Sequence, residues 1–311
     1  MKVSLVIPVY NEEVLIDELI GRTVKALDGF APVFEMIVVD DGSHDGSLQR
    51  LIGYQEADPR IKILVLSRNF GHPSAFTAGL EYASGDYVGM MDGDLQDPPE
   101  LLESMFLMLT GENYDIVSGK RTGRRGNRLR NLIFSGFHAF FKRVANMEDL
   151  ENAGNFCMMN RKTLEALLSM KERVRYLPGL RSFLGFRQGI VEYVREDRFK
   201  GDSKMSLGKL FILGADAIFS FSRLPIRLCL ILGLIGTLVF MVAGIYVLIA
   251  KIFGFAVLGW SSTVLSIYFL GSIQLIFLGV VGEYVYRIYK ESQKRPLYFI
   301  SKIFDREKKE E

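Results

Sequence analysis

The sequence MMDGDLQDPPE at residues 90–100 holds three aspartates, Asp92, Asp94 and Asp97, directly after an apolar run. Burying one unpaired carboxylate costs several kcal/mol, so three of them at the end of a hydrophobic strand indicate that a cation binds there. Hard divalent cations such as magnesium take oxygen ligands, keep several waters and share the oxygens of a substrate phosphate. Asp92, Asp94 and the amide oxygen of Gln96 could supply such ligands. The plainer alternative is a helix-capping turn with solvated carboxylates, because a proline pair follows.

Short β-rich runs alternate with helical stretches around this segment. The expected strands cover Val3–Val9, Phe34–Val39, Ile61–Leu66, Tyr87–Met91, Tyr114–Ser118, Gly154–Asn160 and Gly189–Phe199. The expected helices cover Glu12–Leu27, Gly46–Glu56, Pro73–Ala83, Pro99–Leu109 and Arg161–Met170. This alternation predicts an α/β fold, a mostly parallel sheet with helices on both faces.

Polar motifs follow three of these strands: Pro8-Val-Tyr-Asn-Glu, Asp40-Asp-Gly-Ser and Asp92-Gly-Asp. Ligands of parallel sheets bind beyond the carboxyl ends of the strands, so we expect the three motifs to form one site. The sequence has neither G-x-G-x-x-G nor a P-loop lysine motif, which disfavours a dinucleotide dehydrogenase or an NTPase. A metal ion would then neutralise the phosphates, which fits a donor that carries a diphosphate.

A basic segment, Lys120–Arg130, carries six cations and no acid. Arg121, Arg128 and Arg130 are the candidates for phosphate contacts, while a solvated face or attraction to lipid headgroups explains part of the charge. A nucleic-acid patch is disfavoured, because no aromatic residues interleave with the cations. We therefore expect no nucleic-acid partner. Arg198 is a further phosphate candidate, with a structural ion pair as its alternative.

Two long uncharged stretches, Leu228–Ala250 and Thr263–Gly282, are separated by a loop in which Lys251 is the single charge. A bilayer core needs roughly 20 apolar helical residues, so two membrane spans are expected, with a buried helical hairpin as the alternative. An apolar stripe in Leu207–Phe221 predicts a helix that lies on the membrane surface. The cations that flank the spans place both ends of the chain in the cytoplasm by the positive-inside rule; they are Arg223, Arg227, Arg287, Lys290, Lys294 and Arg295.

Other global properties are less specific. The net charge of +2 indicates no class of partner, and the two cysteines, Cys157 and Cys229, imply neither a disulfide framework nor a zinc site. The first residues run directly into a strand pattern, so we expect no signal peptide and a cytoplasmic N-terminal region.

Four motifs in order resemble the family-2 glycosyltransferases of the GT-A fold: VSLVIPVYNEE, IVVDDGSHDGS, LSRNFGHPSAFTAGL and MMDGDLQDPPELL. FKGDSKMS, the two apolar stretches and GEYVYRIYKESQKRPLYF narrow the resemblance to the polyprenyl-phosphate glycosyltransferases. That group includes bactoprenol glucosyltransferases and, more distantly, dolichol-phosphate mannose synthase.

The resemblance implies roles for the matching positions. Pro8, Tyr10, Glu12 and Asp40 or Asp41 would hold the base and ribose of the nucleotide. Asp92 and Asp94, with Gln96, would bind Mg²⁺ or Mn²⁺ and the donor diphosphate. Arg121, the arginines after it and Lys204 would face the phosphates, and guanidinium groups suit such oxyanions.

One position departs from the pattern. Many relatives carry an acid where this chain has Asn155 in Gly-Asn-Phe. A sugar hydroxyl acceptor needs a general base, but a lipid phosphate arrives already anionic, so Asn155 is tolerable as a hydrogen-bonding residue beside the catalytic Asp94 and Arg121. It could instead signal a different donor sugar.

These inferences predict a GT-A domain at residues 1–204, interface helices at 205–226, membrane helices within 227–290 (about 228–250 and 263–284) and a cytoplasmic tail at 291–311. The predicted activity is inverting, metal-dependent transfer of a hexose, from UDP-glucose or a similar donor, to undecaprenyl or another polyprenyl phosphate at the bacterial inner membrane. The resemblance also implies a homo-oligomer, such as a tetramer. The alternatives are a processive polysaccharide synthase, disfavoured because its Gln-x-x-Arg-Trp motif is missing, and a non-catalytic scaffold that binds sugar nucleotides.

Overall fold

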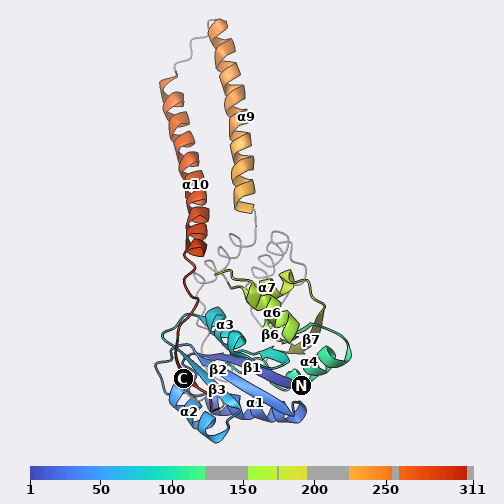
Figure 1. The fold of residues 1–311 in the computed structure, drawn as a ribbon. Helices are drawn as coiled ribbons and strands as arrows, with labels where there is room; N and C mark the ends of the chain where they lie inside the picture. The colour runs from blue at the N-terminus through green and yellow to red at the C-terminus, as the bar shows by residue number, and fades with distance from the viewer. Residues whose placement is uncertain (123–152, 174, 195–223, 254–258, 307–311) are drawn as a thin grey trace. The chain divides into compact units, whose positions relative to one another are not determined.

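The computed structural model describes residues 1–122, 153–173, 175–194, 224–253 and 259–306 (Figure 1). Its strands are β1 (Lys2–Val9), β2 (Val33–Asp40), β3 (Ile61–Leu66), β4 (Tyr87–Met90), β5 (Ile116–Thr122), β6 (Ala153–Asn160), β7 (Gln188–Val194) and β8 (Ile300–Phe304). Its helices are α1 (Ile16–Phe30), α2 (Ser47–Ala57), α3 (His72–Tyr82), α4 (Leu101–Gly111), α6 (Arg161–Ser169), α7 (Leu177–Phe183), α9 (Leu224–Ile252) and α10 (Trp260–Ser292).

The eight described strands form one sheet in the order β7-β5-β6-β4-β1-β2-β3-β8. β4, β1, β2 and β3 are mutually parallel, as are β5 and β7, whereas β6 runs antiparallel to both β4 and β5. The predicted mostly parallel α/β sheet is therefore confirmed. The insertion of β6 beside β4 brings residues that are far apart in the sequence to the carboxyl end of β4.

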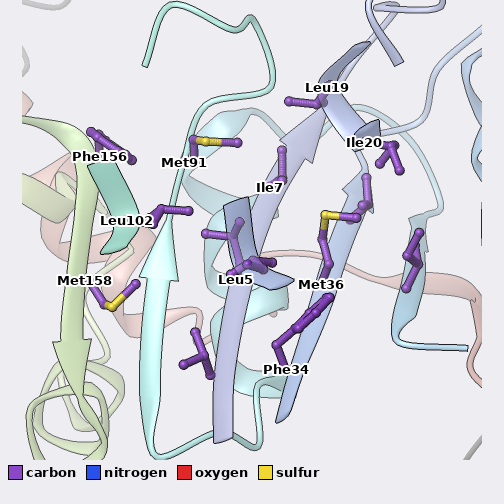
Figure 2. Close-up of a cluster of buried hydrophobic side chains, with 14 of the residues drawn as sticks. Leu5, Ile7, Leu19, Ile20, Phe34, Met36, Met91, Leu102, Phe156 and Met158 are labelled. Atoms are coloured by element: carbon purple, nitrogen blue, oxygen red, sulfur yellow. The ribbon is translucent and has the colours of Figure 1, made fainter. Parts of the chain in front are cut away.

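The central strands are buried on both faces, which explains why their sequences are nearly continuous apolar runs. Leu5 and Ile7 of β1 pack with Phe34 and Met36 of β2 against α1, and Leu102 of α4 joins the same cluster (Figure 2). On the opposite face, alternate residues such as Val6 pack against α3, α6 and α7. Each fully buried side chain of this kind stabilises the fold by about 1.5–3 kcal/mol.

Helix α1 begins four residues later than expected, at Ile16 instead of Glu12. Asn11 has a positive φ of 54°, and the main-chain N–H groups of Glu12 and Glu13 donate to Ser47, the first residue of α2, and to Asp45 in the loop before it. These cross-loop hydrogen bonds hold residues 11–13 in turns, and the helix starts beyond them.

Two elements were not predicted, α7 and β8. β8 pairs antiparallel with β3 and closes that edge of the sheet. Behind it, Lys62 Nζ lies 3.1 Å from both Asp305 and Glu35, and Tyr82 donates to Asp305 at 2.7 Å. Residues near the C-terminus, expected to form only a tail, therefore complete the sheet.

The chain divides into two compact units. One contains the sheet with its helices and the residues from Arg295 onward, and the other contains α9 and α10. Within the described residues, one helical segment, Ser266–Ser292 of α10, is long and apolar enough to cross a membrane, with a mean hydropathy of 1.5. The apolar part of α9, Ile231–Tyr246, is shorter, so the expectation of two spans is not confirmed. The expected surface helix at 207–221 lies outside the described residues.

Candidate active site

The loops after β1 and β2 are bonded to each other beyond the carboxyl ends of these strands. Asn11 N–H donates to Ser43 Oγ at 3.0 Å, and His44 N–H donates to Asn11 Oδ1 at 2.8 Å. Tyr10, one of the residues expected to contact the nucleotide, is exposed, and Pro8 is buried. These two hydrogen bonds join the loops of the first two motifs into one continuous surface, which we call the ledge.

Asp40 and Asp41 are buried at the base of this ledge. Burial raises the pKa of both carboxyl groups, although hydrogen bonds oppose the shift. Both oxygens of Asp41 accept main-chain hydrogen bonds, from Phe70 at 2.8 Å and Gly71 at 2.9 Å. Asp41 therefore positions the turn that starts α3, and Asp40 accepts from Ser43 N–H at 3.2 Å.

The third motif packs against the first through Gly93. A Cβ atom at this position would lie 2.7 Å from the carbonyl oxygen of Pro8, which is closer than Cβ atoms approach in proteins. Glycine is therefore required between Asp92 and Asp94 for the β4 loop to lie against the end of β1. The structure thus brings the strand-end motifs together as predicted.

Asp94 and Gln96 fit the expected cation site. Gln96 Oε1 is buried and has no hydrogen-bond partner within the part of the chain that the structure describes. The main-chain N–H of Gln96 donates to Asp94 Oδ1 at 3.2 Å, so the two residues share one turn. Among the described residues, no three His, Cys, Asp or Glu side chains converge on a metal position. A hard cation here would complete its shell with water and phosphate oxygens, as Mg²⁺ does.

Asp92 is held by two side chains. His72 Nε2 lies 3.2 Å from Asp92 Oδ1, and Asn155 Nδ2 donates to the same oxygen at 3.4 Å. Burial on its own raises the pKa of Asp92, but the interactions with His72, Arg121 and Asn155 outweigh it and lower the pKa. The pairing of Met90 with Cys157 explains the contact, because the antiparallel register continued by two residues sets Asp92 opposite Asn155.

Arg121 lies on the other side of Asp92. Its Nη2 donates to Asp97 Oδ1 at 3.1 Å and lies 4.0 Å from Asp92 Oδ2, while its Nε donates to the Tyr193 hydroxyl at 3.0 Å. Tyr193 in turn donates to Asp97. Burial raises the pKa of Asp97, and the neighbouring carboxylates outweigh burial to raise the pKa of Arg121.

Arg181 of α7 supports the segment that carries Asn155. Its guanidinium is buried and donates to the carbonyl oxygens of Asn155 at 3.1 Å and Gly154 at 2.5 Å, and to Cys157 Sγ. No carboxylate in the described part of the chain forms an ion pair with it within 4.0 Å. The charge is instead solvated by backbone oxygens at the start of β6.

The structure therefore groups Asp92, Arg121 and Asn155, with Asp94 and Gln96 on the adjoining turn. Arg128, Arg130, Arg198 and Lys204 lie outside the described residues. No role was predicted from the sequence for His72, Asp97, Tyr193 or Arg181. Asp97 alone carried a signal, because it belongs to the acidic cluster that first indicated a cation.

Comparisons with known proteins agree with this architecture. The family model described as glycosyl transferase family 2 matches residues 4–168. An uncharacterized glycosyltransferase of Synechocystis is 39% identical over 306 residues, covering 98% of this chain and 96% of its own. The bactoprenol glucosyl transferase of Shigella phage SfV is 37% identical over 303 residues, covering 96% of this chain and 98% of its own.

A solved structure shows the same fold. The glucosyl-3-phosphoglycerate synthase of Mycobacterium tuberculosis, in complex with Mn²⁺, UDP and glucosyl-3-phosphoglycerate, superposes with a TM-score of 0.50 at 20% identity, covering 70% of this chain and 77% of its own. The sheet and its strand-end site thus define a GT-A glycosyltransferase. The chain belongs to glycosyl transferase family 2, and the predicted family and enzyme class are confirmed.

Proposed function

We propose that this glycosyltransferase transfers a hexose from a UDP-sugar, such as UDP-glucose, to undecaprenyl or another polyprenyl phosphate. The turn that joins Asp94 to the unpartnered Gln96 oxygen, beside the Asp92–Arg121 contact, is the observation that carries this proposal. It sets oxygen ligands for a cation next to a guanidinium suited to phosphate. The nearly full-length similarity to a bactoprenol glucosyl transferase supports the lipid acceptor.

The donor would lie along the carboxyl ends of β1, β2 and β4. The nucleoside would contact the ledge through Pro8, Tyr10, Glu12 and Asp40. Asp41 would support this surface by holding the turn that starts α3. Asp92, Asp94 and Gln96 would hold Mg²⁺ or Mn²⁺, which supplies charge compensation for the leaving diphosphate when bound. The structure of the mycobacterial synthase, which holds Mn²⁺ and UDP, shares the fold in which this site is built.

Transfer would proceed by displacement at the anomeric carbon. An oxygen of the acceptor phosphate forms the new C–O bond while the bond to the nucleoside diphosphate breaks, which inverts the configuration. The attacking oxygen is already anionic, so no residue has to remove a proton, and Asn155 can occupy the position at which relatives carry an acid. Arg121 would hold a phosphate, with Arg128, Arg130, Arg198 and Lys204 as further candidate contacts.

The membrane arrangement is part of the same proposal. α9 and α10 would both span the bacterial inner membrane, with the catalytic unit and both termini in the cytoplasm. Exposed apolar side chains along both helices, such as Leu234 and Leu275, suit a lipid environment. Residues 205–226 would lie at the interface, and the membrane helices would mediate self-association.

The test is transfer of radiolabelled sugar from a panel of nucleotide-sugars to a short-chain polyprenyl phosphate by the full-length protein. We expect label in the organic phase, dependent on Mg²⁺ or Mn²⁺, and lost in Asp94→Ala. Label in a polymer would favour a processive synthase, and binding without turnover would favour a scaffold. Metal-independent activity of Asp94→Ala would refute the assigned cation site.

A further inference from the structure

We propose that Asp97 and Tyr193 are positioning residues that fix the guanidinium of Arg121 for an incoming phosphate. This inference rests on the proposed function, because it names residues that act on the phosphate through Arg121. Neither residue was assigned a role from the sequence.

The three side chains form a closed set of hydrogen bonds. Arg121 Nε donates to Tyr193 Oη at 3.0 Å, Arg121 Nη2 donates to Asp97 Oδ1 at 3.1 Å, and the Tyr193 hydroxyl donates to that same aspartate oxygen. The strand pairing enforces this, because Arg121 on β5 is directly paired with Tyr193 on β7. A guanidinium bonded through two of its nitrogen atoms loses the freedom to rotate about its long side chain.

The three side chains differ in solvent exposure, and the exposed one, Arg121, is the one that a ligand could reach. The Asp97 side chain is fully buried, while 26% of the Arg121 side chain is exposed. Tyr193 is fixed from behind, because its ring packs edge-on against Phe156 with 5.8 Å between the centroids. The two buried partners, Asp97 and Tyr193, are therefore held in place, and their hydrogen bonds fix the orientation of the partly exposed Arg121 guanidinium.

The exposed part of Arg121 lies beside Asp92. Its Nη2 is 4.0 Å from Asp92 Oδ2, and its Nη1 bonds to no residue in the described ranges. Gly154 packs against this guanidinium, since a Cβ atom there would lie 3.2 Å from Arg121 Nη2. A phosphate oxygen is the ligand that this planar, charged group binds best. The phosphate could belong to the donor or to the acceptor, and the experiment separates the two.

A double-mutant cycle on the full-length protein tests the proposal, with Tyr193→Phe, Arg121→Lys and the double variant. Calorimetry would measure the Kd for UDP with Mn²⁺ in one arm and for a short-chain polyprenyl phosphate in the other. We expect Tyr193→Phe to weaken one of the two affinities about tenfold in the wild-type background and less than about twofold in the Arg121→Lys background. The arm that responds identifies the phosphate.

The exposed pair Lys120–Glu192, one residue away on the same two strands, provides the matched control. Glu192→Gln should leave both affinities unchanged within about twofold. Asp97→Asn should reproduce the loss caused by Tyr193→Phe, and it should be the more destabilised variant because it leaves a charge without its buried partner. If Asp97→Asn does not fold, Tyr193→Phe still decides the question.

Equal weakening by Tyr193→Phe in both backgrounds, or wild-type affinity in both arms, would overturn the proposal. Binding is measured without turnover, so a protein that binds phosphate through this set but transfers no sugar would refute the proposed function alone. Normal sugar transfer by the Tyr193→Phe variant would refute the positioning role alone.

Discussion

His72 Nε2 lies 3.2 Å from Asp92 Oδ1, although the two residues belong to separate strand-end segments. Asn155 Nδ2 is 3.4 Å from His72 Nδ1 and donates to the same aspartate oxygen. An imidazole protonated at Nε2 satisfies both contacts, because its Nδ1 then accepts from the Asn155 amide. His72 also packs edge-on against Phe76, with 4.7 Å between the rings, so the aspartate is oriented by a histidine that is itself fixed.

His72→Ala should therefore lower kcat/KM by about tenfold, because Asp92 loses one of its two orienting donors. The exposed position of His72 predicts little change in the thermal midpoint. His72→Gln, whose amide can donate to Asp92, should retain more activity. Full activity of His72→Ala in the sugar-transfer assay would contradict this role.

Gly93→Ala should destabilise the protein by about 1–3 kcal/mol and abolish transfer, because its Cβ would meet the Pro8 carbonyl at 2.7 Å. Gly53→Ala is the matched control. Gly53 lies inside α2 with open space around it, so alanine there should raise stability by about 0.5–1 kcal/mol. Chemical unfolding and the transfer assay measure the two effects, and equal behaviour of the variants would contradict the close approach.

Arg181→Met should lower the free energy of unfolding by about 2 kcal/mol, since it removes the donors to the half-buried carbonyl groups of Gly154 and Asn155. Activity should fall as well, because Asn155 follows the displaced backbone. Arg187→Met removes an exposed guanidinium that stacks on Tyr114, and its cost should stay below about 1 kcal/mol. A similar loss in both variants would show that the backbone contacts of Arg181 contribute little.

Deletion of residues 300–311 should cost at least about 2 kcal/mol, because β3 becomes an open edge and Lys62 loses Asp305. Deletion of 307–311 alone keeps β8 and should preserve the thermal midpoint. Asp305→Asn should fall between the two. A catalytic unit of unchanged stability after the longer deletion would show that β8 is dispensable.

The lowered pKa of Glu35 leads us to expect that the protein loses stability in acid. Burial on its own raises the pKa of this carboxyl group, but hydrogen bonds from Ser4, Ser84 and Lys2 outweigh it and lower the pKa from 4.5 to about 2. Because the folded state has the lower pKa, the ionised group stabilises the fold above pH 4.5, and this contribution of about 3 kcal/mol is lost as the pH falls from 4.5 toward 2. Glu35→Gln should be less stable than wild type at pH 7 and approach it near pH 2, as measured by thermal unfolding. A gap that is independent of pH would contradict the shift.

The central sheet was predicted well from the sequence, because β1, β2 and β3 are apolar on both faces. Each of these buried strands can therefore be recognised from its own residues alone. The prediction missed β8, whose five residues have little buried surface and whose partner strand is distant: Ser301 bonds to Val65 across 236 positions. It placed the start of α1 too early, because the acceptors that hold the Glu12 and Glu13 N–H groups, Ser47 and Asp45, lie more than 30 positions away in the sequence.

The same distinction applies to the site. Asp92, Asp94 and Gln96 were found because they are neighbours in the sequence, and closely spaced oxygen ligands indicate a cation site. Asp97 and Tyr193 are 96 positions apart; the parallel pairing of β5 with β7 sets Tyr193 beside Arg121, and both of these side chains bond to Asp97. Strand order, which no local pattern encodes, decided which side chains surround the cluster.

The pairing of β3 with a strand near residue 300 also has a consequence for how the protein is made. The ribosome synthesises β8 only after both long apolar helices, so a nascent chain keeps the β3 edge open throughout translation of α9 and α10. The last strand can join the sheet only once those helices have left the exit tunnel. The catalytic sheet is therefore completed only after both long apolar helices have been synthesised.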